Sequence, residues 1–380
     1  MSSKSLPKAI FEETLLQFLA PIRPFLDDAS VSEIMINGPD TIYVERKGRL
    51  ELTGVTFANR DALEAAMRNC AQYVGKHIDR DRPILEGRLP DGSRIEAVFP
   101  PVAPDGPSVS IRRFFKETLT VKRLIGFGAL TDDAALALEA FVASKMNTLV
   151  AGGTGSGKTS MLNALSSYVP EGERVVVIED SRELQLQRAH VVQMESRPPD
   201  PKGRFAVTIR DLFRASLRMR PDRIVVGEIR GGEALDLIQA MTSGHGGCLS
   251  TLHATYPRDT LSRLETMAMM SDLDMPLHAL RIQLASAVNI IVQVSRLHDG
   301  SRKVTHISEV LGWDIEKETY EIEDIFRREV TGHGEGGEIL SEFLPTGYLP
   351  RCIEQLREHG FDVPPAVYAA AKKKPAPAHG

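Results

Sequence analysis

The feature that most constrains this chain is the segment at positions 152–159, Gly-Gly-Thr-Gly-Ser-Gly-Lys-Thr, which fits the pattern G-x-x-x-x-G-K-[ST] throughout. The run at 147–151 before it is mostly apolar and predicts a short strand, and residues 160–168 predict a helix. A strand, a glycine-rich loop and a helix in this order form a phosphate cradle. The alternative is a glycine-rich turn without a ligand, which a match at every position disfavours.

The spacing gives these residues distinct roles. Glycines let successive backbone N–H groups turn toward a polyphosphate, and the helix N-terminus adds the positive end of its dipole. We expect Lys158 to reach the β- and γ-phosphate oxygens, and the Thr159 hydroxyl to ligate Mg²⁺. The sequence therefore predicts that ATP and Mg²⁺ bind at the following residues: Gly153, Thr154, Gly155, Ser156, Gly157, Lys158, Thr159 and Ser160.

Composition narrows the class of protein. With 380 residues the chain has room for two domains of about 150 residues each. Its net charge of −5 gives no overall attraction for nucleic acid or anionic lipid. The three cysteines lie far apart, which argues against a disulfide framework or a zinc cage and favours a reducing compartment. No apolar run approaches the roughly 18 residues of a membrane span, and no signal peptide is recognised. We therefore expect a cytoplasmic protein that meets a membrane only through a partner.

Changes in the hydrophobic pattern mark the expected domains. Residues 1–30 predict a helical lead-in, and residues 31–117 a small α+β domain with a hairpin turn at Asp91-Gly92. Residues 118–131 form a connection. Residues 132–370 alternate strands with helices, which indicates a mainly parallel, helix-covered sheet and a C-terminal helical part. Its expected strands are 147–151, 174–179, 223–227, 248–252 and 289–294; residues 332–337 are an expected surface loop and 371–380 an expected disordered tail.

Two of the expected strands end in carboxylates, which an ATPase needs near its metal and its attacking water. The first ends at Glu179 and Asp180, with Glu183 three residues beyond. The second ends at Glu228, where a Walker B acid belongs, although Gly227 interrupts the usual apolar run. Solvated carboxylates at strand ends are the alternative, and the complete P-loop disfavours it.

Histidines flank the strand expected at 248–252, with His245 before it and His253 at its end. Zinc binding would need a third ligand, and none lies nearby in the sequence. We favour sensing of the γ-phosphate or positioning of water over a zinc site.

Arginines are the third group of candidates. Arg210, Arg214 and Arg218 recur every four residues, which is typical of solvated faces and of salt-bridge partners. Arg112 and Arg113 stand together at the end of a strand in the small domain, and could neutralise phosphate charge across a subunit boundary. The sequence does not decide which arginines act in this way.

Four segments occur in a characteristic order: the P-loop, 177–184, 218–231 and 244–253. Together they resemble the Walker A, Asp box, Walker B and His box of the secretion ATPases of type II and type IV systems. Residues 32–38 and 89–95 are similar to the N-terminal domain of that family, and 337–369 to the tail of its tight-adherence (Flp) pilus branch. The likeness extends over about residues 30–370. The tetracysteine zinc module of many type II members is absent, which leaves the conjugation-type ATPases as the nearest rival.

The resemblance implies an α/β fold, with a RecA-like P-loop domain preceded by a small α+β (PAS-like) domain, and a homohexameric ring. It implies that Glu183 activates water and that Glu228 supports Mg²⁺ through water, with Lys158 also catalytic. His245 and His253 would read the nucleotide state. The arginines that would reach a bound nucleotide are Arg94, Arg112 and Arg113.

The resemblance also implies what the motor would do in the cell, which is to drive pilin movement through a polytopic inner-membrane platform protein. A type IV secretion ATPase of the conjugation type is the first alternative. A RecA-like nucleic-acid translocase is the second, and the acidic balance of the chain argues against it.

Overall fold

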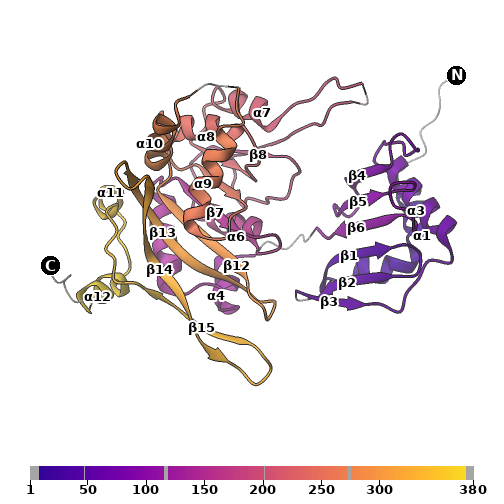
Figure 1. The fold of residues 1–380 in the computed structure, drawn as a ribbon, viewed down its shortest axis with the longest axis horizontal. Coiled ribbons are helices and arrows are strands. Elements are labelled where there is room, and N and C mark those ends of the chain that lie inside the picture. Colours follow the sequence, from indigo (N-terminus) through magenta and orange to yellow (C-terminus); the bar gives the residue numbers. More distant parts are fainter. Residues whose placement is uncertain (1–7, 47, 115–118, 201, 273–274, 374–380) are drawn as a thin grey trace. The chain divides into compact units, whose positions relative to one another are not determined.

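The computed structural model describes residues 8–46, 48–114, 119–200, 202–272 and 275–373. The chain divides into two compact units, Met1–Glu117 and Thr118–Gly380. Each unit has a sheet of its own with helices packed on it (Figure 1).

The N-terminal unit is an antiparallel sheet covered by helices. Its strand order is β3-β2-β1-β6-β5-β4. Helix α3 begins where the Asn59 side chain accepts the N–H of Ala62, and it buries Leu63 and Met67 against the sheet. The hairpin predicted at Asp91-Gly92 is confirmed and joins β4 to β5. The elements are α1 (Lys8–Phe18), η1 (Ala20–Ile22), α2 (Arg23–Asp27), β1 (Val31–Asn37), β2 (Ile42–Arg46), β3 (Arg49–Leu52), α3 (Arg60–Tyr73), β4 (Ile84–Arg88), β5 (Arg94–Val98) and β6 (Ser108–Arg112).

The C-terminal unit contains a nine-stranded sheet, of which six strands are parallel, in the order β12-β7-β11-β10-β8-β9. This confirms the mainly parallel α/β sheet. All residues of β7, β8, β10 and β11 are buried, because helices cover both faces. The elements up to the last parallel strand are α4 (Val121–Gly126), α5 (Asp132–Ala143), β7 (Thr148–Gly152), α6 (Lys158–Ser166), β8 (Val175–Glu179), β9 (Val191–Glu195), α7 (Ile209–Ser216), β10 (Arg223–Val226), α8 (Glu233–Thr242), β11 (Leu249–Leu252), α9 (Pro257–Ala268), α10 (Leu277–Ala287) and β12 (Ile290–Arg296).

Three antiparallel strands continue the sheet beyond β12, and the sequence pattern did not predict them. They are β13 (Arg302–Asp314), β14 (Thr319–His333) and β15 (Ile339–Pro345), and only then follow α11 (Ile353–Glu358) and α12 (Pro365–Lys373). The expected C-terminal helical part corresponds to α11 and α12, and it is preceded by these three strands. These strands are half exposed and rich in charged residues, so they lack the continuous apolar runs that revealed the parallel strands.

Smaller differences concern the segments between elements. The connection at 118–131 contains a helix, α4. The loop expected at 332–337 is shorter, because β14 runs through His333 before the turn. Helix α12 reaches Lys373, and the rest of the expected tail, 374–380, lies outside the described residues. Among the described residues, no helix combines the length and the apolar character needed to cross a membrane.

Candidate functional site

The P-loop joins the end of β7 to the start of α6, as the motif requires. Gly155 and Gly157 have φ angles of +68° and +97°, which side chains other than glycine rarely adopt. The Ser156 hydroxyl donates to the Gly153 carbonyl at 2.8 Å and closes the loop on itself. Since α6 begins at Lys158, its first N–H groups and its dipole are available to an anion.

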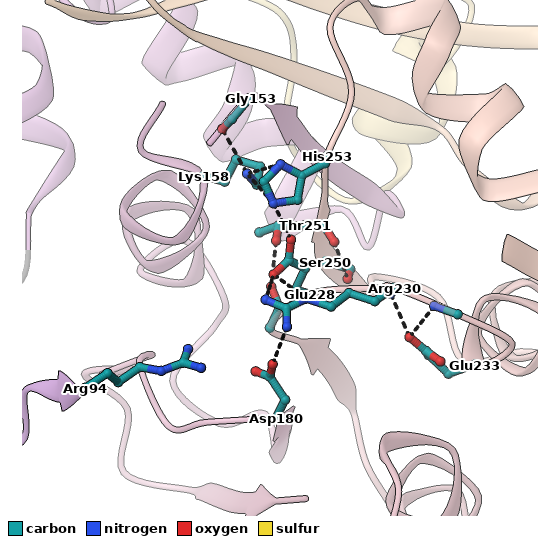
Figure 2. Close-up of polar contacts among 12 residues, drawn as sticks. Arg94, Gly153, Lys158, Asp180, Glu228, Arg230, Glu233, Ser250, Thr251 and His253 are labelled. Carbon is teal, nitrogen blue, oxygen red and sulfur yellow. Dashed lines mark hydrogen bonds and ion pairs between the residues drawn. The ribbon is translucent and has the colours of Figure 1, made fainter. Parts of the chain in front are cut away.

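Lys158 lies at one end of a chain of polar contacts (Figure 2). Its Nζ donates to the Gly153 carbonyl at 3.0 Å and lies 3.3 Å from His253 Nδ1. His253 Nε2 lies 2.8 Å from the Glu228 carboxylate. Burial, together with the Lys158 ammonium, lowers the pKa of His253, and this favours the neutral imidazole. A neutral ring can accept a hydrogen bond from Lys158 and still present its other nitrogen to Glu228.

The chain of contacts continues through Arg230. Its Nε donates to Glu228 at 2.9 Å, and its Nη1 donates to Asp180 at 2.8 Å. The residues in contact follow β7, β11, β10 and β8, which are neighbouring parallel strands, so the carboxyl ends of four strands meet at one edge. We call this group of five residues the P-loop edge: Lys158, Asp180, Glu228, Arg230 and His253.

Glu183 lies on the loop that follows β8 at the same edge of the sheet. Its backbone N–H donates to the Glu179 carboxylate at 2.8 Å, and the N–H of Leu184 donates to the same oxygen at 2.9 Å. The predicted base therefore lies on a loop whose backbone is hydrogen-bonded to the buried Glu179 carboxylate. This loop follows β8, the strand next to β10, which Glu228 follows.

The predicted Mg²⁺ ligands suit that ion. Thr159 stands in the first turn of α6, and Glu228 follows β10 at the edge to which the P-loop belongs. Mg²⁺ commonly takes one or two protein oxygens and completes its octahedron with phosphate oxygens and water. A hydroxyl and a carboxylate are such a set. Among the described residues, no three His, Cys, Asp or Glu side chains form a cluster that could hold a metal alone.

His245 does not join the P-loop edge within the subunit. It precedes β11, whereas His253 follows it, and β11 runs parallel to β7. The two histidines thus lie at opposite edges of the sheet, and only His253 meets Lys158. Both were expected to sense nucleotide because the family resemblance implies that role for both; the parallel pairing of β11 with β7 separates them.

The N-terminal arginines are held in different ways inside their own unit. Arg94 and Arg112 are paired positions on β5 and β6, and Arg112 is exposed. Arg113 donates to the Phe25 carbonyl at 2.6 Å and lies 3.7 Å from the Asp91 carboxylate. Arg113 therefore has a structural role in this unit, and contact of any of the three with nucleotide stays a prediction.

Sequence reasoning missed two cations. Arg230 stands two residues beyond Glu228, so it could have been noticed beside the Walker B acid. Arg302, at the start of β13, donates to the Gly155 carbonyl at 2.7 Å. A contact between residues 147 positions apart leaves no signal in a single sequence. By contrast, Arg210 and Arg214 pair with Asp236 at 2.7 and 3.0 Å, as expected of salt-bridge partners.

Comparisons with known proteins agree with the fold and with the family that the motifs resemble. The family model described as "Type II/IV secretion system protein" matches residues 16–329. Type IV secretion system protein PtlH of Bordetella pertussis is 36% identical over 310 residues, covering 73% of this chain and 89% of the relative. Conjugal transfer protein TrbB of Rhizobium radiobacter is 32% identical over 291 residues, covering 74% of this chain and 85% of the relative.

Two solved structures share the fold. The pilus retraction motor PilT with bound ADP has a TM-score of 0.54 and 19% identity, over 96% of this chain and 89% of its own. The ATPase DotB of Legionella pneumophila has a TM-score of 0.53 and 21% identity, over 83% and 84%. With the P-loop edge in place and the family model matching more than half of its length, this chain belongs to the type II/IV secretion ATPase superfamily.

Proposed function

We propose that this chain is a motor ATPase that hydrolyses ATP to power assembly of a tight-adherence or related pilus, or related secretion, at the inner membrane. The observation that carries the proposal is the P-loop edge, where Lys158, His253 and Glu228 are in contact beside a P-loop. Membership of the secretion ATPase superfamily supports the class of reaction.

In the proposed mechanism, Lys158 would bind the β- and γ-phosphate oxygens, and Thr159 and Glu228 would hold Mg²⁺, the latter through water. Mg²⁺ would offset negative charge on the phosphates. Glu183 takes a proton from the attacking water. His253 contacts both Lys158 and Glu228, so it reports whether the lysine has turned to a phosphate.

The two carboxylates can be told apart by substitution. Glu183→Gln should still bind ATP while turnover falls by roughly 10²-fold or more, because an amide cannot accept the proton from water. Glu228→Gln should weaken the dependence of binding on Mg²⁺. The measurement is ATP affinity and single-turnover rate for each variant. The reverse pattern would exchange the two assignments.

The proposal includes a homohexameric ring in which arginines of the N-terminal unit reach a nucleotide. Arg112 is the best candidate because it is exposed, whereas Arg113 is engaged with Phe25 and Asp91. Turnover per chain should rise steeply with protein concentration as rings form, in step with the mass measured in solution. Arg112→Ala should reduce turnover more than ATP binding. A monomer with full activity that ignores this substitution would rule out the ring mechanism and leave ATP hydrolysis intact.

The transported substrate has two candidate classes. Similarity of 337–369 to the tail of the tight-adherence branch favours a pilin, moved through a polytopic inner-membrane platform protein that would hold this chain at the cytoplasmic face. The names of TrbB and PtlH favour a conjugal or type IV secretion machine. Crosslinking in cells and identification of the membrane partner separates the two. In a nucleic-acid translocase, DNA would instead stimulate turnover at low salt, and this stimulation would be lost at high salt.

A further inference from the structure

Glu179 is a buried carboxylate to which the proposed mechanism gives no role. It is the last residue of β8, it follows three valines and an isoleucine, and it is only 3% exposed. Burying a carboxylate is costly unless hydrogen bonds compensate for the lost water. A glutamate at this position therefore needs a reason.

The side chain of Glu179 accepts two hydrogen bonds from one loop. Its Oε1 accepts the N–H groups of Glu183 and Leu184, which belong to the segment 180–184 at the start of the loop between β8 and β9. Burial raises the pKa of Glu179 to about 7, with the two N–H donors opposing the rise and the carboxylates of Asp180 and Glu183 adding to it. Protonated or ionised, the carboxyl keeps an oxygen that can accept both bonds.

The same loop is fastened at two further points. The Asn163 side chain on α6 accepts the N–H of Gln185 at 3.0 Å, and Gln193 on β9 donates to the Leu184 carbonyl at 3.0 Å. The Leu184 side chain is fully buried. The loop is thus tied to β8, to β9 and to the helix that begins at the P-loop, and Glu179 accepts two of these bonds.

Gly227 provides the space that Glu179 occupies. A Cβ at position 227 would lie 2.8 Å from Glu179 Cγ, closer than real Cβ contacts come. This explains why the apolar run before Glu228 is interrupted by a glycine.

We propose that Glu179 is a positioning residue that fixes the loop at 180–184, and through it Glu183, with Gly227 making room for it. This rests on the proposed role of Glu183 as the base that activates water. Glu179 acts through the backbone of the loop and touches no substrate. A small displacement of a catalytic group is enough to slow a reaction by about 10²-fold.

The test compares Glu179→Ala and Glu179→Gln with a matched control, Glu309→Ala. Glu309 is also buried and accepts backbone N–H groups, in the antiparallel part of the sheet. We expect Glu179→Ala to lower kcat by about 10- to 100-fold with ATP affinity nearly unchanged. Glu179→Gln keeps the accepting oxygen and should restore most of the turnover. Glu309→Ala should lower stability without changing turnover per folded molecule.

Amide hydrogen exchange at Glu183 and Leu184 gives a second readout that does not depend on activity. Exchange at both should speed up in Glu179→Ala and stay slow in Glu179→Gln. Should Glu179→Ala fail to fold, Gly227→Ala displaces the carboxylate without deleting it and should give the same pattern. The proposal is overturned if the alanine variant turns over normally, or if the glutamine variant is as inactive as the alanine one.

Glu183→Gln, measured alongside, separates this proposal from the one it rests on. Normal turnover in that variant would remove the catalytic role of Glu183. Faster exchange of the two amides in Glu179→Ala would still support the fastening of the loop, and unchanged exchange would overturn it.

Discussion

Each half of the nine-stranded sheet contains a buried glutamate, and the two glutamates have different roles. In the parallel half, Glu179 fastens the loop that carries Glu183, at the edge where Lys158 and Glu228 lie. In the antiparallel half, Glu309 on β13 accepts the Tyr348 hydroxyl at 2.7 Å and two backbone N–H groups at 2.8 and 2.9 Å, which holds the segment after β15.

The difference comes from strand direction. Parallel strands place all their carboxyl ends at one edge, so loops from distant parts of the sequence meet there. Antiparallel neighbours send successive ends to opposite edges, so their loops do not converge. A buried glutamate that accepts backbone N–H groups therefore holds a loop of the candidate catalytic edge in one half. In the other half it holds the C-terminal segment against the sheet.

Removing a lysine from each half should give the largest contrast. Lys158→Ala should reduce turnover by roughly 10³-fold or more, because the charge that binds the β- and γ-phosphates is lost. Lys317→Ala removes an exposed lysine from the turn between β13 and β14, where it pairs with Asp314, and should leave turnover unchanged. Steady-state ATP hydrolysis measures both. Near-normal turnover in Lys158→Ala would refute the catalytic role of the P-loop.

The pH dependence of the free energy of unfolding tests how much stability the parallel half loses when the buried Glu179 ionises. The folded chain raises the pKa of Glu179 to about 7, so between its ordinary value and 7 the folded state binds more protons than the unfolded state. This contribution to stability is complete below the ordinary pKa and is lost as the pH rises through 7. Relative to Glu179→Gln, which does not ionise, wild type should lose about 3 kcal/mol between pH 4.5 and 8.

The measurement is urea unfolding of both proteins across that pH range, with the difference between them plotted against pH. A difference that stays constant would show that Glu179 ionises in the folded chain as it does in water.

The smallest expected effect concerns a contact in which the antiparallel half reaches the P-loop. Arg302→Gln removes the donor to the Gly155 carbonyl and should weaken ATP binding by about fivefold, the equivalent of about 1 kcal/mol for one hydrogen bond. Turnover at saturating ATP should not change. Arg327→Gln, at an exposed position on β14, is the matched control. If Arg302→Gln reduced turnover as much as Lys158→Ala does, the functional distinction between the two halves of the sheet would be wrong.

The sequence by itself determined the features that depend on neighbouring residues. The P-loop, the strands that end at Glu179 and near Glu228, and the turn at Asp91-Gly92 were all predicted, because local spacing and backbone preference define them. Parallel strands buried on both faces are mostly apolar, so their order with the helices could be predicted. The exception is β9, a partly exposed strand at the edge of the sheet, which was not predicted.

Only the tertiary structure decided which of these residues meet. It separated His245 from His253, because the parallel pairing of β11 with β7 brings only the residue that follows β11 to the edge where the P-loop lies. It brought Arg302 to Gly155 and gave Glu179 its two N–H donors. It also revealed β13 to β15, which are half exposed and are stabilised by pairing with neighbouring strands. Pairing between distant segments depends on three-dimensional packing, which local sequence pattern does not encode.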